Sequence, residues 1–450
     1  MIEIEDALLS QSNNTNKGKK IPSSRVARVS MFGRLAARVV GNMVVEGAKE
    51  LSKGNRPSSK DLLLTPNNME HLASKLAHLR GAAMKLGQMI SMDAGELLSP
   101  ELSNILSRLR SDAASMPHKQ LVNLLKDNWG HDWIDNFGYF DLRPFAAASI
   151  GQVHIANLAS GEKLAVKLQY PGVKQSIASD VDNVATLLKV SGLLPEQIDI
   201  STLLEEAKQQ LQNEADYELE ANYIKAYSQN LSTEEFELPT VISSLSNPTI
   251  LVMSFVEGES IEQTLKLPQE DRNALVENMI KLFLAELFDF KLMQTDPNFA
   301  NFLYNPTTKK IGLLDFGATR PISEDISQGY RKLINSGISG AIDTNNMIAA
   351  AKQIGFFQRE IHPDCLSAIM AIFELACEPI CYPGMYDFEQ SNLASRIREK
   401  GLAIQRQTDQ WHTPPVDALF IHRKLGGIYL MATKLKAKVN VKALFNPYIL

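Results

Sequence analysis

The chain has 450 residues, which exceeds one ordinary domain and fits two or three lobes. Hydrophobic residues make up 44% of it and charged residues 22%, as in soluble globular proteins. The formal net charge of −5 shows no basic excess, so we expect no nucleic-acid partner. Three cysteines are too few for a disulfide framework and favour a reducing compartment, with Cys377 and Cys381 structural and not zinc ligands.

The N-terminal sixty residues divide into two predicted parts. Residues 1–24 are polar and are expected to form a disordered tail. In residues 25–60, apolar side chains from Val29 to Gly47 recur at helical spacing opposite Arg34 and Arg38, before a polar linker. Such an amphipathic helix either lies on an anionic membrane surface or packs on the rest of the protein, and its pattern does not decide between these.

The hydropathy of the chain also bears on its location. No stretch of about twenty apolar residues is present, so we expect no membrane-spanning helix. The opening residues, from Met1 to Asp6, have the features of neither a signal peptide nor a transit peptide. We therefore expect a protein of the bacterial cytoplasm that can lie peripherally on the inner face of the membrane.

The remaining chain is predicted to form a helical extension, a strand-rich lobe and a helical lobe. Residues 61–140 are mainly helical and contain a helix over His118–Trp129, residues 141–256 form the first lobe, and residues 257–450 form the second. The expected strands are Phe145–Ala156 with a turn inside it, Leu164–Gln169, Leu238–Ile242, Thr249–Phe255, Phe302–Tyr304 and Ile311–Asp315, and one long helix covers Asp199–Leu231.

Lys167 interrupts one of these apolar strands. A buried ammonium is costly unless a carboxylate pairs with it, so a lysine at a strand edge that reaches water is the simpler interpretation of this residue alone. The long helix that follows offers three partners, Glu214, Asp216 and Glu220. Asp216 and Glu220 are four residues apart and would share a helix face.

Two further motifs follow in the second lobe. Asp296 and Asn301 stand five residues apart around a turn, and Asp315-Phe316-Gly317 ends the next strand. Each motif alone is compatible with ordinary turn chemistry. Phosphoryl transfer needs a lysine on the phosphates, a glutamate on that lysine, an Asp and an Asn on the metal, and an Asp beside the nucleophile. Because the residues occur in this order, the sequence predicts binding of ATP (or ADP) and Mg²⁺.

From about Arg25 onward the chain resembles the AarF/UbiB/ADCK family of atypical kinases. The resemblance implies an α+β, two-lobed protein-kinase-like fold with an N-terminal helical extension, and an association with ubiquinone biosynthesis through the coenzyme Q branch. The motifs that carry it are Lys85-Leu-Gly-Gln88, Ala146-Ala-Ala-Ser149, Glu214-Ala-Asp216, Gln294-Thr-Asp-Pro-Asn-Phe-Ala-Asn301 and Asp315-Phe-Gly317.

The resemblance also implies a role for each residue that matches these motifs. The catalytic residues would be Asp296 as base, Lys167 on the phosphates with Glu220 as its partner, and Lys85. Glu214 and Asp216 would face the Lys85 segment, and Asn301 and Asp315 would hold the metal. The nucleotide would further contact the loop of Ala146, Ala147, Ala148 and Ser149 and the backbone of a hinge at Met253, Ser254, Phe255 and Val256.

The chain departs from ordinary protein kinases in three places. Gln294-Thr295-Asp296 replaces His-Arg-Asp, alanines replace the glycines that let a backbone approach phosphates, and no long activation segment follows Gly317. These departures argue against a protein substrate. We hypothesise that Lys85 and the alanine loop restrain transfer to proteins. The alternatives are that Lys85 fastens the extension to the core and that the alanines are small packing residues.

The leading function is therefore a Mg-ATP-dependent ATPase or kinase that supports ubiquinone biosynthesis at a membrane surface. Its expected partners are an isoprenoid lipid or quinone precursor and other quinone-biosynthesis proteins. Two alternatives stay open: a phosphotransferase for a small molecule unrelated to quinones, and a non-catalytic nucleotide-binding scaffold. Intact Asp296, Asn301 and Asp315 count against the scaffold.

Overall fold

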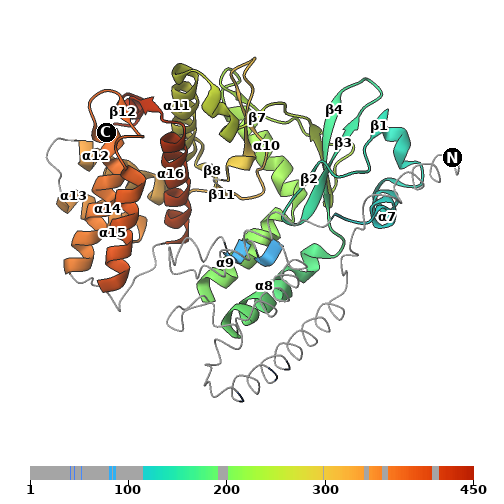
Figure 1. Cartoon of the computed structure of the whole chain (residues 1–450), viewed down its shortest axis with the longest axis horizontal. Coiled ribbons are helices and arrows are strands. Elements are labelled where there is room, and N and C mark those ends of the chain that lie inside the picture. Colours follow the sequence, from blue (N-terminus) through green and yellow to red (C-terminus); the bar gives the residue numbers. More distant parts are fainter. Residues whose placement is uncertain are drawn as a thin grey trace. The chain divides into compact units, whose positions relative to one another are not determined.

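The structure is a computed structural model of the full chain (Figure 1). It describes residues 41, 45, 52, 81–83, 85–87, 115–190, 201–296, 298–338, 344–356, 363–407 and 415–449. The chain divides into two units, one of Met1–Ala221 with Thr240–Phe255 and one of Asn222–Pro239 with Val256–Leu450. The predicted tail and nearly all of the predicted amphipathic helix lie outside the described residues, as does Gln88, and the predicted domain boundaries stay predictions.

Unit 1 is built on an antiparallel sheet with the order β1-β3-β4-β6, in which β2 also pairs with β3. The central strands follow the predicted segments, and β4 is the predicted buried apolar run with one lysine inside it. Val166 and Lys167 of β4 stand opposite His154 and Val153 of β3. The strands are β1 (Tyr139–Phe140), β2 (Ala146–Ala147), β3 (Gly151–Asn157), β4 (Lys163–Gln169) and β6 (Ile250–Ser254).

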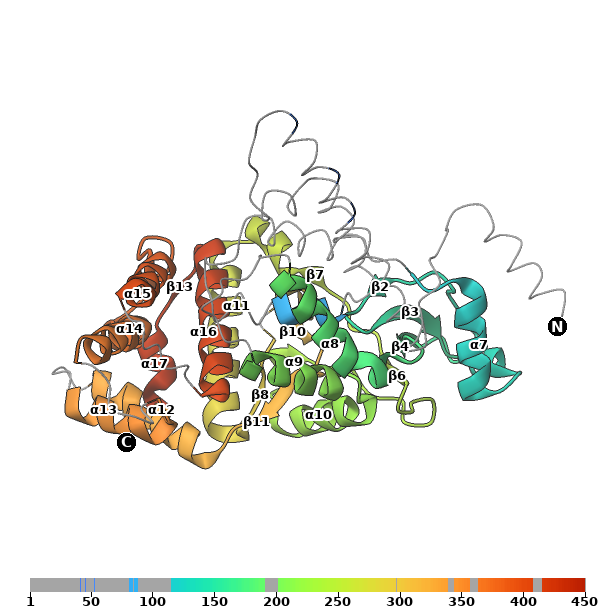
Figure 2. The ribbon, with the colours of Figure 1, turned by 90° about the horizontal axis from the view of Figure 1, so that it is seen from below.

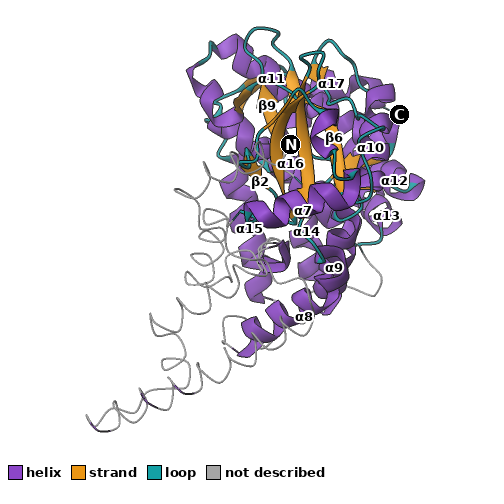
Figure 3. Cartoon of the chain, turned by 90° about the vertical axis from the view of Figure 1, so that its right-hand side faces the viewer, coloured by secondary structure: helices purple, strands orange, loops and turns teal. Residues whose placement is uncertain are grey.

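Helix α7 (His118–Trp129) has the predicted bounds and covers one face of this sheet (Figure 3). Its Leu121 and Leu125 are fully buried in a core cluster with Leu164, Val166 and Val252 of the sheet. The 3₁₀ turn η3 (Trp133–Asn136) continues the same cluster through an aromatic side chain. Burial of these apolar side chains, at about 25 cal/mol per Å² of area removed from water, holds the helix on the sheet.

The single long helix predicted over Asp199–Leu231 is wrong. The structure instead has α9 (Ser201–Glu214) and α10 (Tyr217–Asn230), preceded by α8 (Val173–Val190). The chain breaks because the Asp216 side chain accepts a hydrogen bond from the Leu219 N–H at 3.0 Å, as a helix-capping aspartate does. The break leaves Glu214 and Glu220 on different helices.

Unit 2 contains a helical array, which includes α11 and α12–α17 (Figure 2). It also contains three small sheets, and the strand order in the largest is β5-β10-β9-β7. The strands predicted at 302–304 and 311–315 are confirmed as β9 and β10, whereas the strand predicted at 238–242 is wrong. That segment makes only an isolated bridge from Val241 to Met253, and the preceding β5 pairs with β10. The sequence analysis missed the other six strands described in this unit, because strands of two or three residues have no measurable periodicity.

The elements of unit 2 are as follows. The helices are α11 (Gln269–Ala285), α12 (Glu324–Ile338), α13 (Thr344–Ile354), α14 (Pro363–Cys381), α15 (Leu393–Gln407), α16 (Val416–Lys434) and α17 (Val441–Phe445), with 3₁₀ turns η4 (Ile261–Lys266), η6 (Phe299–Asn301) and η7 (Asn446–Tyr448) and the π-helical turn η5 (Glu286–Phe290). The strands are β5 (Phe236–Glu237), β7 (Glu259–Ser260), β8 (Leu292–Gln294), β9 (Phe302–Tyr304), β10 (Ile311–Leu313), β11 (Thr319–Pro321), β12 (Tyr386–Asp387) and β13 (Lys438–Val439).

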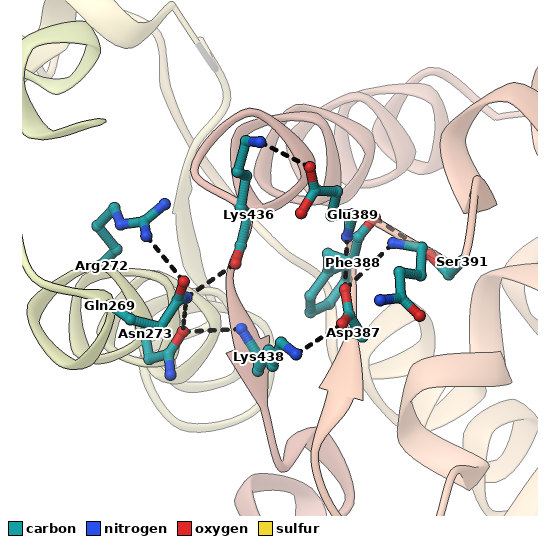
Figure 4. A network of polar contacts seen from close by, with 10 residues as sticks. Gln269, Arg272, Asn273, Asp387, Phe388, Glu389, Ser391, Lys436 and Lys438 are labelled. Carbon is teal, nitrogen blue, oxygen red and sulfur yellow. Dashed lines mark hydrogen bonds and ion pairs between the residues drawn. The ribbon is translucent and has the colours of Figure 1, made fainter. Parts of the chain in front are cut away.

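A polar network fastens the end of α16 to the start of α11 (Figure 4). The Gln269 side chain donates to the Lys436 carbonyl, and the Lys438 N–H donates to the Asn273 side chain, both at 2.8 Å. Lys436 adopts a left-handed conformation (φ 53°), which turns the chain from the helix into β13. On the far side of β13, the Lys438 ammonium pairs with Asp387 of β12 at 2.9 Å. The network sets where α16 ends relative to α11.

The mixture of helices and antiparallel strands confirms the predicted α+β class. In the described part of the chain, no helix has the length and apolarity needed to cross a membrane.

Candidate active site

Lys167 lies in the interior of unit 1. Its side chain is 10% exposed, and its Nζ donates to Oε1 of Glu220, which is 1% exposed, at 2.6 Å. The strand places the lysine opposite the uncharged residues Val153 and Leu251, and its carboxylate partner comes from α10. The pairing of Lys167 with Glu220 that the sequence predicts is therefore present, and the ammonium is not that of an edge lysine.

Glu214 joins two other predicted residues at the end of α9. One of its carboxylate oxygens accepts from Lys85 Nζ at 2.5 Å, and the other accepts from Ser149 Oγ at 2.9 Å. Lys85 is 4% exposed, so this contact neutralises a buried ammonium. The contact between Lys85 and Glu214 is expected if Lys85 fastens the N-terminal extension to the core. It also places Lys85 near the alanine loop, as the hypothesis of restrained transfer requires.

A close backbone contact supports the same junction. A Cβ atom at Gly81 would lie 2.8 Å from the Ser149 carbonyl oxygen, so this helical position has no room for a side chain. Glycine inside a helix costs about 1 kcal/mol relative to alanine, and the close approach accounts for it here. The segment that carries Lys85 thus packs directly on the loop that carries Ser149.

Asp216 differs from its expected placement. Its carboxylate caps α10 and lies 3.2 Å from Lys174 Nζ on α8, with both side chains about two-fifths exposed. The Leu219 N–H and the Lys174 ammonium hold the pKa of this carboxyl below its usual value, although desolvation acts in the opposite direction. In the part of the chain that the structure describes, Glu214 contacts Lys85, whereas Asp216 contacts Lys174 and the Leu219 N–H.

The alanine loop is open to solvent. Ala146 and Ala147 form β2 and are exposed, and the Ala148 N–H closes a turn onto the Gly151 carbonyl at 3.0 Å. Their exposure argues against a packing role for Ala146 and Ala147, whereas Ala148 is half-buried. The loop instead presents its backbone on the outside of the sheet, where a ligand can approach it.

More backbone groups of the predicted hinge, residues 253–256, are hydrogen-bonded within the protein than the sequence analysis expects. The Ser254 N–H donates to the Thr240 carbonyl and the Phe255 N–H donates to the Lys163 carbonyl, both at 2.9 Å. Phe255 also lies under the Lys163 ammonium, 3.7 Å from the ring centroid, and against Phe145. Two of the four hinge amides are therefore engaged within unit 1, and Met253 is paired with Ala165 in the β4–β6 register, so three of the four predicted hinge residues already have backbone partners in the sheet.

Asn301 and Asp315 of unit 2 lie next to each other across the β9–β10 hairpin. Phe302 and Leu313 are the last residue pair of the two strands. Just beyond them, the Leu314 N–H donates to the Asn301 carbonyl at 3.0 Å. The Asp315 carboxylate accepts from the Gly317 N–H at 3.0 Å. The Nδ2 atom of Asn301 is buried and has no hydrogen-bond partner among the described residues. Both side chains line one small cavity of about 10 Å³.

Asp296 follows β8 in a loop that is tied to the Asp-Phe-Gly segment. Thr295 donates to the Ala318 carbonyl through its N–H at 3.2 Å and through its hydroxyl at 2.6 Å. The Gln294 side chain donates to the Asp296 carbonyl at 2.8 Å. Pairing of β8 with β11 continues this contact, so the loop of the predicted base is bonded to the segment that follows the predicted metal ligand Asp315.

A buried charged network beneath this loop escaped the sequence analysis. Lys424 of α16 and Glu286 of η5 form an ion pair with 1% and 0% exposure. The Lys424 ammonium also donates to the Gln294 carbonyl at 2.8 Å, and Tyr227 donates to Glu286 and accepts from the Gln294 N–H, both at 2.7 Å. Burial raises the pKa of the Glu286 carboxyl, and the facing Lys424 opposes that rise. The signal in the sequence was weak, because Glu286 and Lys424 stand among apolar residues but close to the other charged residues Asp289 and Arg423.

The comparisons with known proteins agree with the geometry. Residues 108–350 match the ABC1 atypical kinase-like domain. The chain belongs to the ABC1 atypical kinase-like family. This membership confirms the resemblance and the kinase-like fold class predicted from the motifs.

Several members of this family are similar over most of their length. Atypical kinase COQ8, mitochondrial, of Saccharomyces cerevisiae is 36% identical over 445 residues, which cover 97% of this chain and 87% of the relative. Atypical kinase COQ8B, mitochondrial, of Rattus norvegicus is 35% identical over 443 residues, covering 97% and 82%. The solved complex of Rv3197 with erythromycin from Mycobacterium tuberculosis shares the fold, with a TM-score of 0.57, 23% identity and coverage of 84% of this chain and 95% of that one.

Asn301 and Asp315 of this ABC1-family chain suit a magnesium ion that is also bound by phosphates and water. They do not suit a metal ion bound by protein side chains alone. Mg²⁺ is usually bound through one or two carboxylates together with waters and substrate phosphates. Asn301 and Asp315 offer one amide and one carboxylate, which matches that pattern. Among the described residues, no group of three or more His, Cys, Asp and Glu side chains could hold a metal ion. The residues present therefore fit a metal that arrives with a nucleotide.

The buried pair predicts a large effect on stability. Replacement Lys424→Met leaves the Glu286 carboxylate buried without its counter-charge and removes the bond to the Gln294 carbonyl. We expect a loss of about 3–5 kcal/mol in the free energy of unfolding. Urea unfolding followed by circular dichroism measures it.

The control for this substitution is Lys332→Met on α12. Lys332 is exposed and donates to the Gln353 side chain at 2.9 Å, so its loss should change stability by no more than about 0.5 kcal/mol. The double variant Glu286→Leu with Lys424→Met should regain most of the lost stability, because no unpaired charge stays buried. Equal stability of Lys424→Met and Lys332→Met would contradict the importance of the pair.

Proposed function

We propose that this chain is a Mg-ATP-binding atypical kinase that hydrolyses ATP or phosphorylates a small molecule or lipid, in support of ubiquinone biosynthesis at a membrane surface. The observation that carries the proposal is the placement of Asn301 and Asp315 across one hairpin, with the Asp296 loop bonded to the same Asp-Phe-Gly segment. An oxygen-donor pair beside a carboxylate is what phosphoryl transfer requires of a protein, because positioning and electrostatics supply most of its catalysis.

Each residue has a distinct task in this proposal. Asn301 and Asp315 hold the magnesium, which when bound neutralises charge on the phosphates. Lys167 binds the phosphates, and Glu220 orients its ammonium, as their 2.6 Å contact allows. Asp296 orients the nucleophile and accepts its proton as the bond to the phosphorus forms.

The short connection after the Asp-Phe-Gly segment favours a small acceptor. Only six residues separate Gly317 from the first residue of α12, Glu324, and three of them form β11. Peptide-phosphorylating kinases use a long segment at this point to hold their substrate. Water, a small molecule or a lipid headgroup needs no such platform.

The proposed link to quinone biosynthesis rests on the relatives of this chain. Two of the most similar family members carry the name atypical kinase COQ8 or COQ8B, and this chain covers more than four-fifths of each. The family resemblance associates such kinases with ubiquinone biosynthesis, so we propose an isoprenoid lipid or quinone precursor as the acceptor or ligand. Other quinone-biosynthesis proteins are the proposed protein partners.

The metal role of Asp315 predicts a specific loss. Asp315→Asn should weaken binding of Mg-ATP by about tenfold or more, because even changes around metal ligands cost 10–100-fold. The fold should survive, since the amide can still accept from the Gly317 N–H. Thermal shift with Mg-ATP measures the effect. The control is Asp271→Asn, which removes a surface pair with Lys309 at the far end of the same hairpin. An undiminished shift in Asp315→Asn would exclude this role.

Product analysis separates the proposed reaction from its alternatives. Purified protein is incubated with radiolabelled Mg-ATP, with and without isoprenoid alcohols and quinone precursors in vesicles. We expect free phosphate, or label on the added lipid, and formation of either about 10²–10⁴-fold more slowly with Asp296→Asn. Label on an unrelated metabolite would support the small-molecule phosphotransferase, and nucleotide binding without any turnover would support the scaffold.

The membrane location predicts a role for residues 25–51. A variant that lacks residues 1–51 should sediment less with anionic vesicles than the full chain does. Binding of the full chain should weaken when the ionic strength rises from about 0.1 M to about 1 M, because the Debye length falls from about 10 Å to about 3 Å. Neutral vesicles serve as the control. Equal sedimentation of both proteins would show that this segment packs on the protein instead.

A further inference from the structure

Arg423 of α16 faces the predicted catalytic base. Its guanidinium Nη2 lies 3.6 Å from Oδ1 of Asp296, within ion-pair range but beyond an ordinary hydrogen bond. The two side chains are only 16% and 19% exposed, so water screens the attraction incompletely. Arg423 is 127 residues further along the chain than Asp296, and no motif in the sequence connects the two.

The neighbours of Arg423 on α16 hold its backbone in place. His422 shares a 2.8 Å hydrogen bond with the Tyr330 hydroxyl and stacks on Phe356, and burial lowers its pKa to about 4. Lys424 is anchored by its pair with Glu286. Because both flanking side chains are buried and bonded, the direction in which α16 presents Arg423 has little freedom.

The same helix also fixes the loop that carries Asp296. Lys424 donates to the Gln294 carbonyl, and the Gln294 side chain donates to the Asp296 carbonyl, both at 2.8 Å. The Asp296 carboxylate accepts from the Asn298 N–H at 3.3 Å. One turn of α16 thus sets the position of the loop backbone and of the cation opposite its carboxylate.

A third contact extends this arrangement to the segment after Asp-Phe-Gly. Arg320 of β11 pairs with Asp417 at the start of α16 at 3.1 Å and lies over the Phe420 ring at 4.9 Å. Helix α16 therefore contacts both strands of the β8–β11 pair, and Arg423 stands between these contacts.

We propose that Arg423 is a positioning residue for Asp296. It holds the carboxylate in the orientation that accepts the nucleophile's proton, so the catalytic loop is assembled without phosphorylation of an activation segment. In kinases that depend on such phosphorylation, arginine contacts to the added phosphate order the catalytic region. Here the cation–carboxylate contact is built from the chain itself, and the short Gly317–Glu324 connection needs no phosphate. This inference rests on the proposed function.

The variants follow from this role. Arg423→Gln keeps most of the side chain's length and removes its charge, and it should lower kcat for ATP turnover by about 10–100-fold, less than the 10²–10⁴-fold that a general base contributes. KM for Mg-ATP should change by no more than about twofold, because the contact is to the base and not to the nucleotide. Arg423→Lys should recover part of kcat. The matched control is Arg396→Gln, which removes an ion pair with Glu378 on α14 and should leave kcat unchanged.

A double-mutant cycle with Asp296→Asn tests whether Arg423 acts through Asp296. If Arg423 acts through Asp296, then Arg423→Gln should cost little further activity in the Asp296→Asn background. Additive losses in the cycle, or a rise in KM with unchanged kcat, would overturn the inference. If Arg423→Gln does not fold, as shown by circular dichroism, the same cycle is run with Arg423→Lys.

Hydrogen exchange separates failure of the inference from failure of the proposed function. A wild-type protein that binds Mg-ADP but shows no turnover would contradict the proposed function alone. The backbone amides of residues 294–301 should then still exchange faster in Arg423→Gln than in the wild type and Arg396→Gln. Unchanged exchange in that loop would overturn the positioning role.

Discussion

The ion pair between Glu286 and Lys424 is the interaction on which the catalytic half of this molecule depends. Both charges are fully removed from water, so each is tolerable only while the other is present. Glu286 lies in the π-helical turn that follows α11, and Lys424 lies in the middle of α16. Their pairing fixes these two helices against each other, and the remaining hydrogen-bonding capacity goes to Tyr227 and to the backbone of Gln294.

That arrangement has a direct consequence for the chemistry. The backbone at Gln294 is held from both sides, by an N–H bond to Tyr227 and a carbonyl bond to Lys424. Asp296 is only two residues further on, and Thr295 between them is bonded to the Asp-Phe-Gly segment. The buried pair is thus a mechanical support for the proposed base and for the proposed metal ligands. An ordinary protein kinase builds this support partly from a segment that this chain lacks.

Unit 1 also contains carboxylates that pair with buried lysines. Glu214 and Glu220 each meet a buried lysine, and the capped break at Asp216 sends the two residues onto different helices. Glu220 serves the strand lysine, while Glu214 links Lys85 to Ser149 of the alanine loop. A single unbroken helix would have placed Glu214 and Glu220 about 9 Å apart along its axis with a fixed rotation between them, by the 1.5 Å rise per residue. The break removes that constraint.

The sequence by itself determined the class of the fold and the chemistry of the proposed site. The order of Lys167, Glu220, Asp296, Asn301 and Asp315 predicts a phosphoryl-transfer site because each step of that reaction requires a particular kind of side chain. The bounds of α7, β4 and β9 were also predictable, since local periodicity and turn residues determine them. These features depend on short stretches of chain.

Only the tertiary structure decided the partners of those residues. The contacts of Asp296 with Arg423, and of Gln294 with Lys424, join segments about 130 residues apart, and no local pattern records such a separation. The break at Asp216 was hidden for a different reason: an aspartate is compatible with both a helix interior and a cap, and its contacts with Lys174 and the Leu219 N–H select the cap. The sequence therefore determines which groups are proposed for the chemistry. Long-range packing determines which charges stand beside them, because burial makes a charge depend on whichever partner the fold brings to it.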